Sequence, residues 1–196
     1  MVSEIETMTE LQQHITNYFG IPQHALDQIQ ARFQETKLIK GEYFTKEGLA
    51  VKQLSFIKTG LLRVFKNEDN KEVTQWISTP GEFITDLSSL VFDTPSRWQI
   101  QALTDCEFYS ITISDYRSIN QILPEWVQLE KLFIAKCFLS LEDRTYNLIS
   151  MSAEERYLNF IENKGTLLNE VPHHYLASML GMTPETLSRI RKKITS

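Results

Sequence analysis

The chain has 196 residues, of which 42% are apolar and 23% are charged, and its net charge is −5. This composition argues against disorder and leaves room for one large domain or two small ones. Cys106 and Cys137 form no CxxC motif, the stretch "MVSEIETMTE" is acidic and lacks the apolar core expected of a signal peptide, and there is no 18-residue apolar run. We therefore expect a cytoplasmic protein without disulfides or membrane segments.

The pattern of apolar residues between positions 11 and 33 predicts two helices. One ends at Gly20, and Pro22 is suited to open the other. Their apolar faces comprise Leu11, Ile15, Tyr18 and Phe19 in the first, and Ala25, Leu26, Ile29 and Phe33 in the second.

Between residues 37 and 113 the spacing of apolar residues changes from a helical to a β-strand pattern. Short β-rich runs alternate with breakers such as Gly41, Gly48, Gly60, the polar stretch 67–70 and Pro80-Gly81. Several short strands with regular turn signals indicate an antiparallel barrel or sandwich.

A long helical pattern follows Pro124. Eleven of the 16 residues at 126–141 are apolar, and they occupy more than one helical face. One face can pack on the β-domain, and the other needs a cover, most simply the same helix of a second subunit. A central helix inside one monomer is the alternative, and Lys131 and Thr145 interrupt any coiled-coil repeat. The row repeating every seven residues consists of Val127, Ile134, Leu141 and Leu148.

The C-terminal segment is all helical in pattern. Ser152 and Glu155 form a capping box that starts a helix, and the polar stretch 163–170 ends it. A short helix over residues 174–180 then meets Gly181, and Thr183 and Pro184 suit the start of the last helix.

This last segment has its own charge balance. Residues 171–196 carry a net charge of +3, which leaves −8 on the other 170 residues. The asymmetry indicates either a module that meets a polyanion or a helix with a favourable cationic C-terminal turn.

The two closely spaced helices have the layout of a helix-turn-helix, whose second helix enters the major groove of DNA. Leu187, Ile190 and Ile194 are expected to face inward. Arg can grip a guanine edge, Glu can accept from cytosine, and Ser or Thr can bind phosphate. The candidate DNA contacts are Thr183, Glu185, Thr186, Ser188, Arg189 and Lys192.

The run "LASMLGMTPETLSRIRKKI" resembles the DNA-binding motif of the cyclic-AMP receptor protein/fumarate-nitrate regulator (Crp/Fnr) family, and its core "GMTPETLSR" is fairly specific. "FIKTGLLRVF", "PGEFITDL" and "SAEERYLNFI" extend the similarity over most of the chain. The resemblance implies an α+β fold: a cyclic-nucleotide-binding-like β-roll at residues 1–123, a dimerisation helix at 124–150 and a helix-turn-helix domain at 151–196. It implies a homodimeric transcription regulator that binds an inverted repeat of DNA, with RNA polymerase as a further candidate partner.

By the same resemblance, Glu185 and Arg189 take the main base-reading positions, with Ser188 beside them, while Thr186 and Lys192 serve the phosphate backbone. Pro184 stands where the founding receptor has another base-contacting arginine, so the base preference does not carry over. Many relatives continue into a β-hairpin wing beyond this point, so for residues 151–196 we expect a wing that is short or absent and no wing contacts to DNA.

The resemblance also locates an effector pocket. Nucleotide-binding members hold the ribose with a Gly-Glu pair and the cyclic phosphate with an Arg-Ser/Thr-Ala run. Aligned without gaps, these positions read Thr85-Asp86 and Ser96-Arg97-Trp98 here, just after Glu82 of the "GEF" turn. Arg97 is one position out of register, which reverses its direction in a strand. The other interpretation is that Arg97 is a surface arginine and Trp98 belongs to the core.

Other chemistries have little support. The two cysteines lie far apart, and none of His14, His24, His173 and His174 falls in the β-region, so we expect no metal or cofactor. No catalytic constellation stands out, and we expect no enzyme. The sequence thus predicts a DNA-binding regulator that does not depend on cyclic AMP, with an unknown effector if one exists. The alternative is a small-molecule-binding or protein-interaction module whose helix-turn-helix no longer binds DNA.

Overall fold

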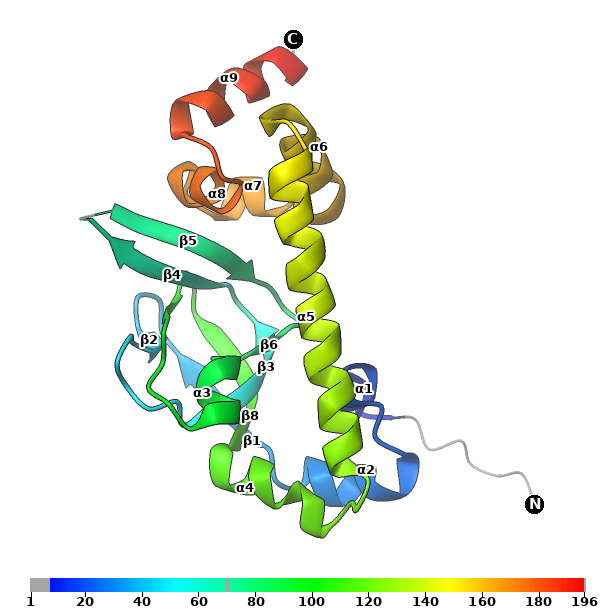
Figure 1. Cartoon of the computed structure of the whole chain (residues 1–196). Coiled ribbons are helices and arrows are strands. Elements are labelled where there is room, and N and C mark those ends of the chain that lie inside the picture. The colour runs from blue at the N-terminus through cyan, green and yellow to red at the C-terminus, as the bar shows by residue number, and fades with distance from the viewer. Residues whose placement is uncertain (1–7, 70, 196) are drawn as a thin grey trace.

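The computed structural model describes residues 8–69 and 71–195. A β-roll packs beside one long helix, α5, and a group of shorter helices lies at the far end of α5 (Figure 1). An antiparallel β-roll followed by helices is the α+β fold that the sequence predicted, and this prediction is confirmed.

The first two helices, α1 (Glu10–Phe19) and α2 (Gln23–Gln30), lie against the lower part of α5 (Figure 1). Thr9 and Gln12 form a capping box on α1, and Gly20 ends this helix with φ 69°. Pro22 is the N-cap of α2 rather than its first helical residue. Phe33, expected on α2, lies beyond the end of the helix and packs against the same core.

The β-roll consists of two four-stranded antiparallel sheets, with strand orders β1-β8-β3-β6 and β2-β7-β4-β5. Their strands are β1 (Gln34–Leu38), β2 (Tyr43–Thr45), β3 (Gln53–Thr59), β4 (Leu62–Glu68), β5 (Lys71–Ser78), β6 (Phe83–Ile84), β7 (Gln99–Ala102) and β8 (Cys106–Thr112). The polar stretch at 67–70, read as a turn, begins inside β4, and residue 70 lies outside the described residues.

Gly60 separates β3 from β4 and cannot be replaced without strain. Its φ is 90°, and a Cβ at this position would lie 2.4 Å from the carbonyl oxygen of Asp105. The backbone needs both the left-handed conformation and the missing side chain at this turn.

Short helices within and after the roll were not predicted. They are α3 (Leu87–Phe92), α4 (Ile113–Arg117) and the 3-10 turn η1 (Ser118–Gln121). Helices of four to six residues are too short for a helical period to show in the sequence.

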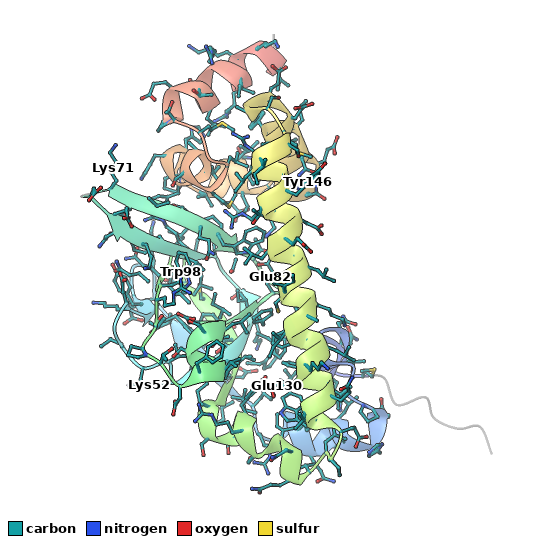
Figure 2. All side chains as sticks on the ribbon, in the orientation of Figure 1. Lys52, Lys71, Glu82, Trp98, Glu130 and Tyr146 are labelled. Atoms are coloured by element: carbon teal, nitrogen blue, oxygen red, sulfur yellow. The ribbon has the colours of Figure 1, made fainter. Side chains whose placement is uncertain are left out.

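The helix predicted after Pro124 is α5 (Trp126–Ser150), which runs along the β-roll and on to the C-terminal helices (Figure 1). Trp126 and Phe133 are buried against the roll, α1 and α2. The side of α5 away from the roll is largely apolar and exposed, and Figure 2 shows Tyr146 there. Its exposed apolar residues are Val127, Leu132, Phe138, Leu139, Leu141, Tyr146 and Ile149.

The C-terminal domain contains α6 (Ala153–Lys164), α7 (Leu167–Glu170), α8 (His173–Met179) and α9 (Pro184–Thr195). The predicted capping box of Ser152 and Glu155 is present on α6. The segment expected only to end α6 instead forms α7, because Leu167 is buried in the core of this domain.

The C-terminal core continues into the β-roll. Leu61 and Ile77 of the roll belong to the same buried cluster as Tyr157, Leu176 and Leu187. The helical domain is therefore packed onto the β4–β5 hairpin rather than tethered by α5 alone (Figure 1). None of the helices in the described part of the chain has the length and apolar content needed to span a bilayer.

Candidate DNA interface and effector pocket

The turn between α8 and α9 depends on one glycine. Gly181 has φ 65°, and a Cβ at this position would lie 3.0 Å from Cδ2 of Leu148 on α5. Leu148, the last residue of the row of Val127, Ile134 and Leu141, is 40% exposed and also lies beside this turn. The tight turn and its support on α5 fix the direction in which α9 leaves the domain.

Helix α9 has one buried and one exposed face. Leu187 and Ile190 are buried among α6 and α8, as the helical period predicted. Ile194 was expected to face inward as well, but it is 38% exposed because α9 extends past the end of the domain core. The exposed face carries Glu185, Ser188, Arg189 and Lys192, and Pro184 lies at its start.

Thr183 caps α9. Its hydroxyl accepts a hydrogen bond from the amide of Thr186 at 3.2 Å and donates to the Thr186 hydroxyl at 3.2 Å. The pKa of Glu185 lies below its ordinary value, because its own backbone amide and the Thr183 hydroxyl favour the carboxylate. Glu185 is therefore an anionic acceptor at the exposed start of α9 at neutral pH.

The four basic residues of α9 are not equivalent. Lys193 binds Glu154 of α6 at 2.7 Å, and Arg191 contacts His173 of α8. Arg189 is exposed and has neither a hydrogen bond nor an ion pair to any residue that the structure describes. Part of the basic cluster in the sequence thus holds the domain together, and Arg189 points away from it.

The predicted effector pocket is organised around the buried carboxylate of Asp86. Its Oδ1 accepts from the amide and hydroxyl of Ser88 and from the amide of Ser89, which caps α3. Its Oδ2 accepts from the Ser96 hydroxyl at 3.0 Å and the Arg97 amide at 2.7 Å. Burial raises the pKa of Asp86, but the hydrogen bonds from Ser88, Arg97, Ser89 and Ser96 outweigh it, so the pKa lies below its ordinary value.

The remaining pocket candidates are spread out. The Arg97 side chain is exposed, and Trp98 is half-buried against the core of the roll. The Thr85 hydroxyl donates to the carbonyl of Gln53. Glu82 lies beside α5, away from Trp98 (Figure 2), where it accepts from Trp76 at 3.0 Å and pairs with Lys164 at 2.5 Å. The structure therefore brings Asp86, Ser96 and the Arg97 backbone together and places Glu82 at the contact between domains.

One residue at the contact between the β-roll and the C-terminal helices was not predicted from the sequence. Arg63 of β4 is buried, and its guanidinium lies 3.6 Å from the ring centre of Tyr175 on α8 and 4.1 Å from that of Phe65. It pairs with Glu72 at 2.5 Å and donates to the Thr74 hydroxyl at 2.9 Å. The sequence signal that could have identified Arg63 is a single arginine inside an apolar strand, because a buried arginine is unusual unless its charge is paired.

A second link joins the same elements, because the amide of Thr74 donates to the Ser178 hydroxyl of α8 at 2.9 Å. The first helix of the helix-turn-helix is thus held to the β4–β5 hairpin by polar contacts as well as by packing.

Comparisons with known proteins agree with this architecture. Residues 35–121 match the family model of the cyclic nucleotide-binding domain. The sequence has no significant match among curated proteins. Many solved structures share the fold, at low sequence identity.

Three examples each cover more than four fifths of the chain. The c-di-GMP-responsive global regulator CLP of Xanthomonas campestris has 15% identity and a TM-score of 0.66, covering 89% of this chain and 92% of its own. The catabolite activator protein of Thermus thermophilus has 23% identity and a TM-score of 0.56, with coverages of 90% and 84%. FixK2 of Bradyrhizobium japonicum has 20% identity and a TM-score of 0.68, with coverages of 83% and 84%. The TM-scores and coverages show a common fold that includes both the β-roll and the C-terminal helices.

Proposed function

We propose that this protein is a homodimeric, sequence-specific DNA-binding transcription regulator of the Crp/Fnr type. The observation that carries the proposal is the outer face of α9, where Glu185, Ser188 and Arg189 are exposed while Leu187 and Ile190 anchor the helix. A rigid helix that presents exposed polar side chains is what major-groove recognition requires.

The proposed roles follow from side-chain chemistry. Arg189 can make two hydrogen bonds to a guanine edge, and the Glu185 carboxylate can accept from the amino group of cytosine. Ser188 lies one residue before Arg189 and can reach the adjoining base or phosphate. Thr183 and Thr186, at the N-terminus of α9, and Lys192 bind the phosphate backbone.

The proposal includes a dimer through α5. Val127, Phe138, Leu141 and Ile149 leave a broad apolar strip exposed on the side of α5 away from the roll, with Ile149 81% exposed. Such a strip on a single long helix is well suited to pairing with the same helix of a second copy. Two-fold symmetry then predicts an inverted-repeat operator with half-sites about 34 Å apart, one turn of DNA.

Independence from cyclic AMP is part of the same proposal. A cyclic phosphate needs a cationic donor and nearby amides. In the β-roll, the Arg97 amide and the N-terminus of α3 already donate to the ionised Asp86 carboxylate, and the Arg97 side chain is exposed. An incoming phosphate would have to displace this internal anion. We further propose that the protein is cytoplasmic and is not an enzyme. RNA polymerase is a further candidate partner.

The alternative is a ligand- or protein-binding module that does not bind DNA, and one experiment separates the two. Random duplexes are selected on the purified protein, and the enriched sequence is titrated by fluorescence anisotropy at several salt concentrations. A DNA-binding regulator enriches an inverted repeat, and its affinity falls steeply with salt. Absence of any enriched repeat, with equally weak binding to all duplexes, would favour the module.

A further inference from the structure

A cavity lies where three parts of the molecule meet. It has a volume of about 250 Å³ and lies between β5, the second half of α5, α6 and the end of α8. It is distinct from the region around Asp86 in the β-roll, which does not line it. Its lining includes Trp76, Arg144, Asn147, Phe160, Lys164 and Met179.

Arg144 is the unusual residue of this cavity. It is half-buried, its Nη2 donates to the Met179 carbonyl at 3.3 Å, and no carboxylate of the described chain pairs with it. Burial lowers the pKa of this guanidinium from its ordinary value. A desolvated cation without a counter-ion is costly, and an anion that enters the cavity removes that cost.

The other cations of the lining already have partners. Lys164 pairs with Glu82 and donates towards the Ile77 carbonyl. Arg156 donates to the carbonyls of Leu180, Met151 and Gly181, which ties α6 to the helix-turn-helix turn. Arg144 therefore provides the charge that is left for a ligand, and the Asn147 side-chain amide lies one helical turn further along α5.

The cavity also has a flat aromatic wall. The Lys164 Nζ lies 4.2 Å from the Trp76 ring centre, and the Arg144 guanidinium carbon lies 5.4 Å from it. Phe160 and Leu180 supply apolar surface from the C-terminal domain. Asp143 also lines the cavity, but it is exposed to solvent. The aromatic and apolar walls, together with a guanidinium that no carboxylate pairs, favour a ligand that is both apolar and negatively charged.

We propose that this cavity is a binding site for a small aromatic anion, a carboxylate or phosphate monoester, whose anionic group pairs with Arg144 and whose ring packs on the apolar wall formed by Phe160 and Leu180 beside Trp76. The ligand would touch the β-roll, the long helix and the helix-turn-helix domain at once. Ser140, Arg144 and Asn147 lie on the face of α5 opposite Phe138 and Ile149, so a dimer through the apolar strip leaves the site accessible.

The binding test uses the full-length chain and two probes, phenyl phosphate and benzoate, measured by isothermal titration calorimetry with benzyl alcohol as the neutral comparison. We expect at least one anion to bind with a dissociation constant of about 1 mM or tighter, and the alcohol at least tenfold more weakly. Arg144→Met keeps an unbranched apolar stem but removes the guanidinium, and it should weaken binding of the anion at least tenfold. Arg97→Met is the matched control at the β-roll and should leave the affinity unchanged.

Arg144 also lines a second cavity, of about 370 Å³, on the hairpin side. Ser140 lines only the first cavity and Gln75 only the second, so Ser140→Trp should abolish binding and Gln75→Trp should not. This pair also keeps the test decisive if Arg144→Met folds poorly. The proposal would be overturned if neither anion binds. It would also be overturned if binding is lost in Arg97→Met or in Gln75→Trp rather than in Arg144→Met or Ser140→Trp. None of these measurements uses DNA, so their outcome is independent of the proposed DNA binding.

Discussion

The β-roll pocket and the outer face of α9 treat their polar groups in opposite ways. In the pocket, the Asp86 carboxylate accepts hydrogen bonds from Ser88, Ser89, Ser96 and the Arg97 amide. On α9, Arg189 is exposed and has no such partner in the described chain. Buried polar groups that satisfy one another stabilise a fold, whereas polar groups left exposed on a rigid element are available to a partner. The difference argues for a protein whose roll is a scaffold and whose last helix makes the external contacts.

The largest effect is expected from breaking the dimer. Leu141→Glu places a charge in the exposed apolar strip of α5 and should weaken dimerisation by about a hundredfold or more, about 2.8 kcal/mol, because the carboxylate would be buried without a partner. Tight DNA binding should be lost with it. Light scattering and DNA titration measure the two effects.

Lys136→Glu is the matched control, since Lys136 is exposed on another side of α5. It should leave the dimer intact. A wild-type protein that is monomeric at micromolar concentration would contradict the dimer.

A smaller effect is expected in the pocket. Asp86→Asn removes the charge that four residues hydrogen-bond and should lower the free energy of unfolding by about 2 kcal/mol near neutral pH. The folded-state pKa of Asp86 lies below its ordinary value, so its charge stabilises the fold above about pH 4 and this contribution is lost as the pH falls through the folded-state pKa. Denaturant unfolding at pH 7 and at pH 3 should show the difference between wild type and variant closing in acid.

Asp93→Asn serves as control, because Asp93 is exposed and pairs only at the surface with Arg117. Its effect should stay within about 0.5 kcal/mol. If Asp86→Asn were as mild as this control, the internal hydrogen bonds would not be what organises the pocket.

Lys192→Ala should lower the affinity for DNA modestly and by a similar factor for all duplexes. A lysine that contacts phosphate contributes to all duplexes alike, so the affinity for specific and random DNA should fall together and the salt slope should drop by about one. A selective loss at the operator would instead place Lys192 against a base.

The smallest effect is expected from cyclic AMP. Calorimetry and operator titrations with and without the nucleotide should show a change in DNA affinity of less than tenfold, about 1.4 kcal/mol. Micromolar binding that strengthens operator affinity beyond this limit would restore Arg97 and Asp86 as ligand contacts.

The sequence predicted those features whose signal is local. The Ser152 capping box, the α8–α9 turn at Gly181 and the burial of Leu187 and Ile190 follow from spacing and residue type, and the structure has them. The β-roll followed from short strands punctuated by breakers, and the wider architecture from the family resemblance.

Features that depend on distant parts of the chain were not predictable in this way. The contact of Arg63 with Tyr175 joins residues 112 positions apart, and Glu82 meets Lys164 across the domain boundary. Leu148 belongs to the apolar row by its heptad position and is 40% exposed, but its closeness to the turn at Gly181 could not be read from that position. Spacing on one helix gives the face of a residue, and only the tertiary structure shows what covers that face.

The most direct test of DNA recognition is the effect of Arg189→Ala on a selected inverted-repeat operator and on a duplex of scrambled sequence. We expect the variant to lose about 1–3 kcal/mol of operator affinity, measured by fluorescence anisotropy at one salt concentration, while its affinity for the scrambled duplex changes far less. Arg117→Ala, an exposed arginine of α4 far from α9, should change neither. Unchanged operator affinity in Arg189→Ala would contradict the assignment of α9 as the helix that reads DNA.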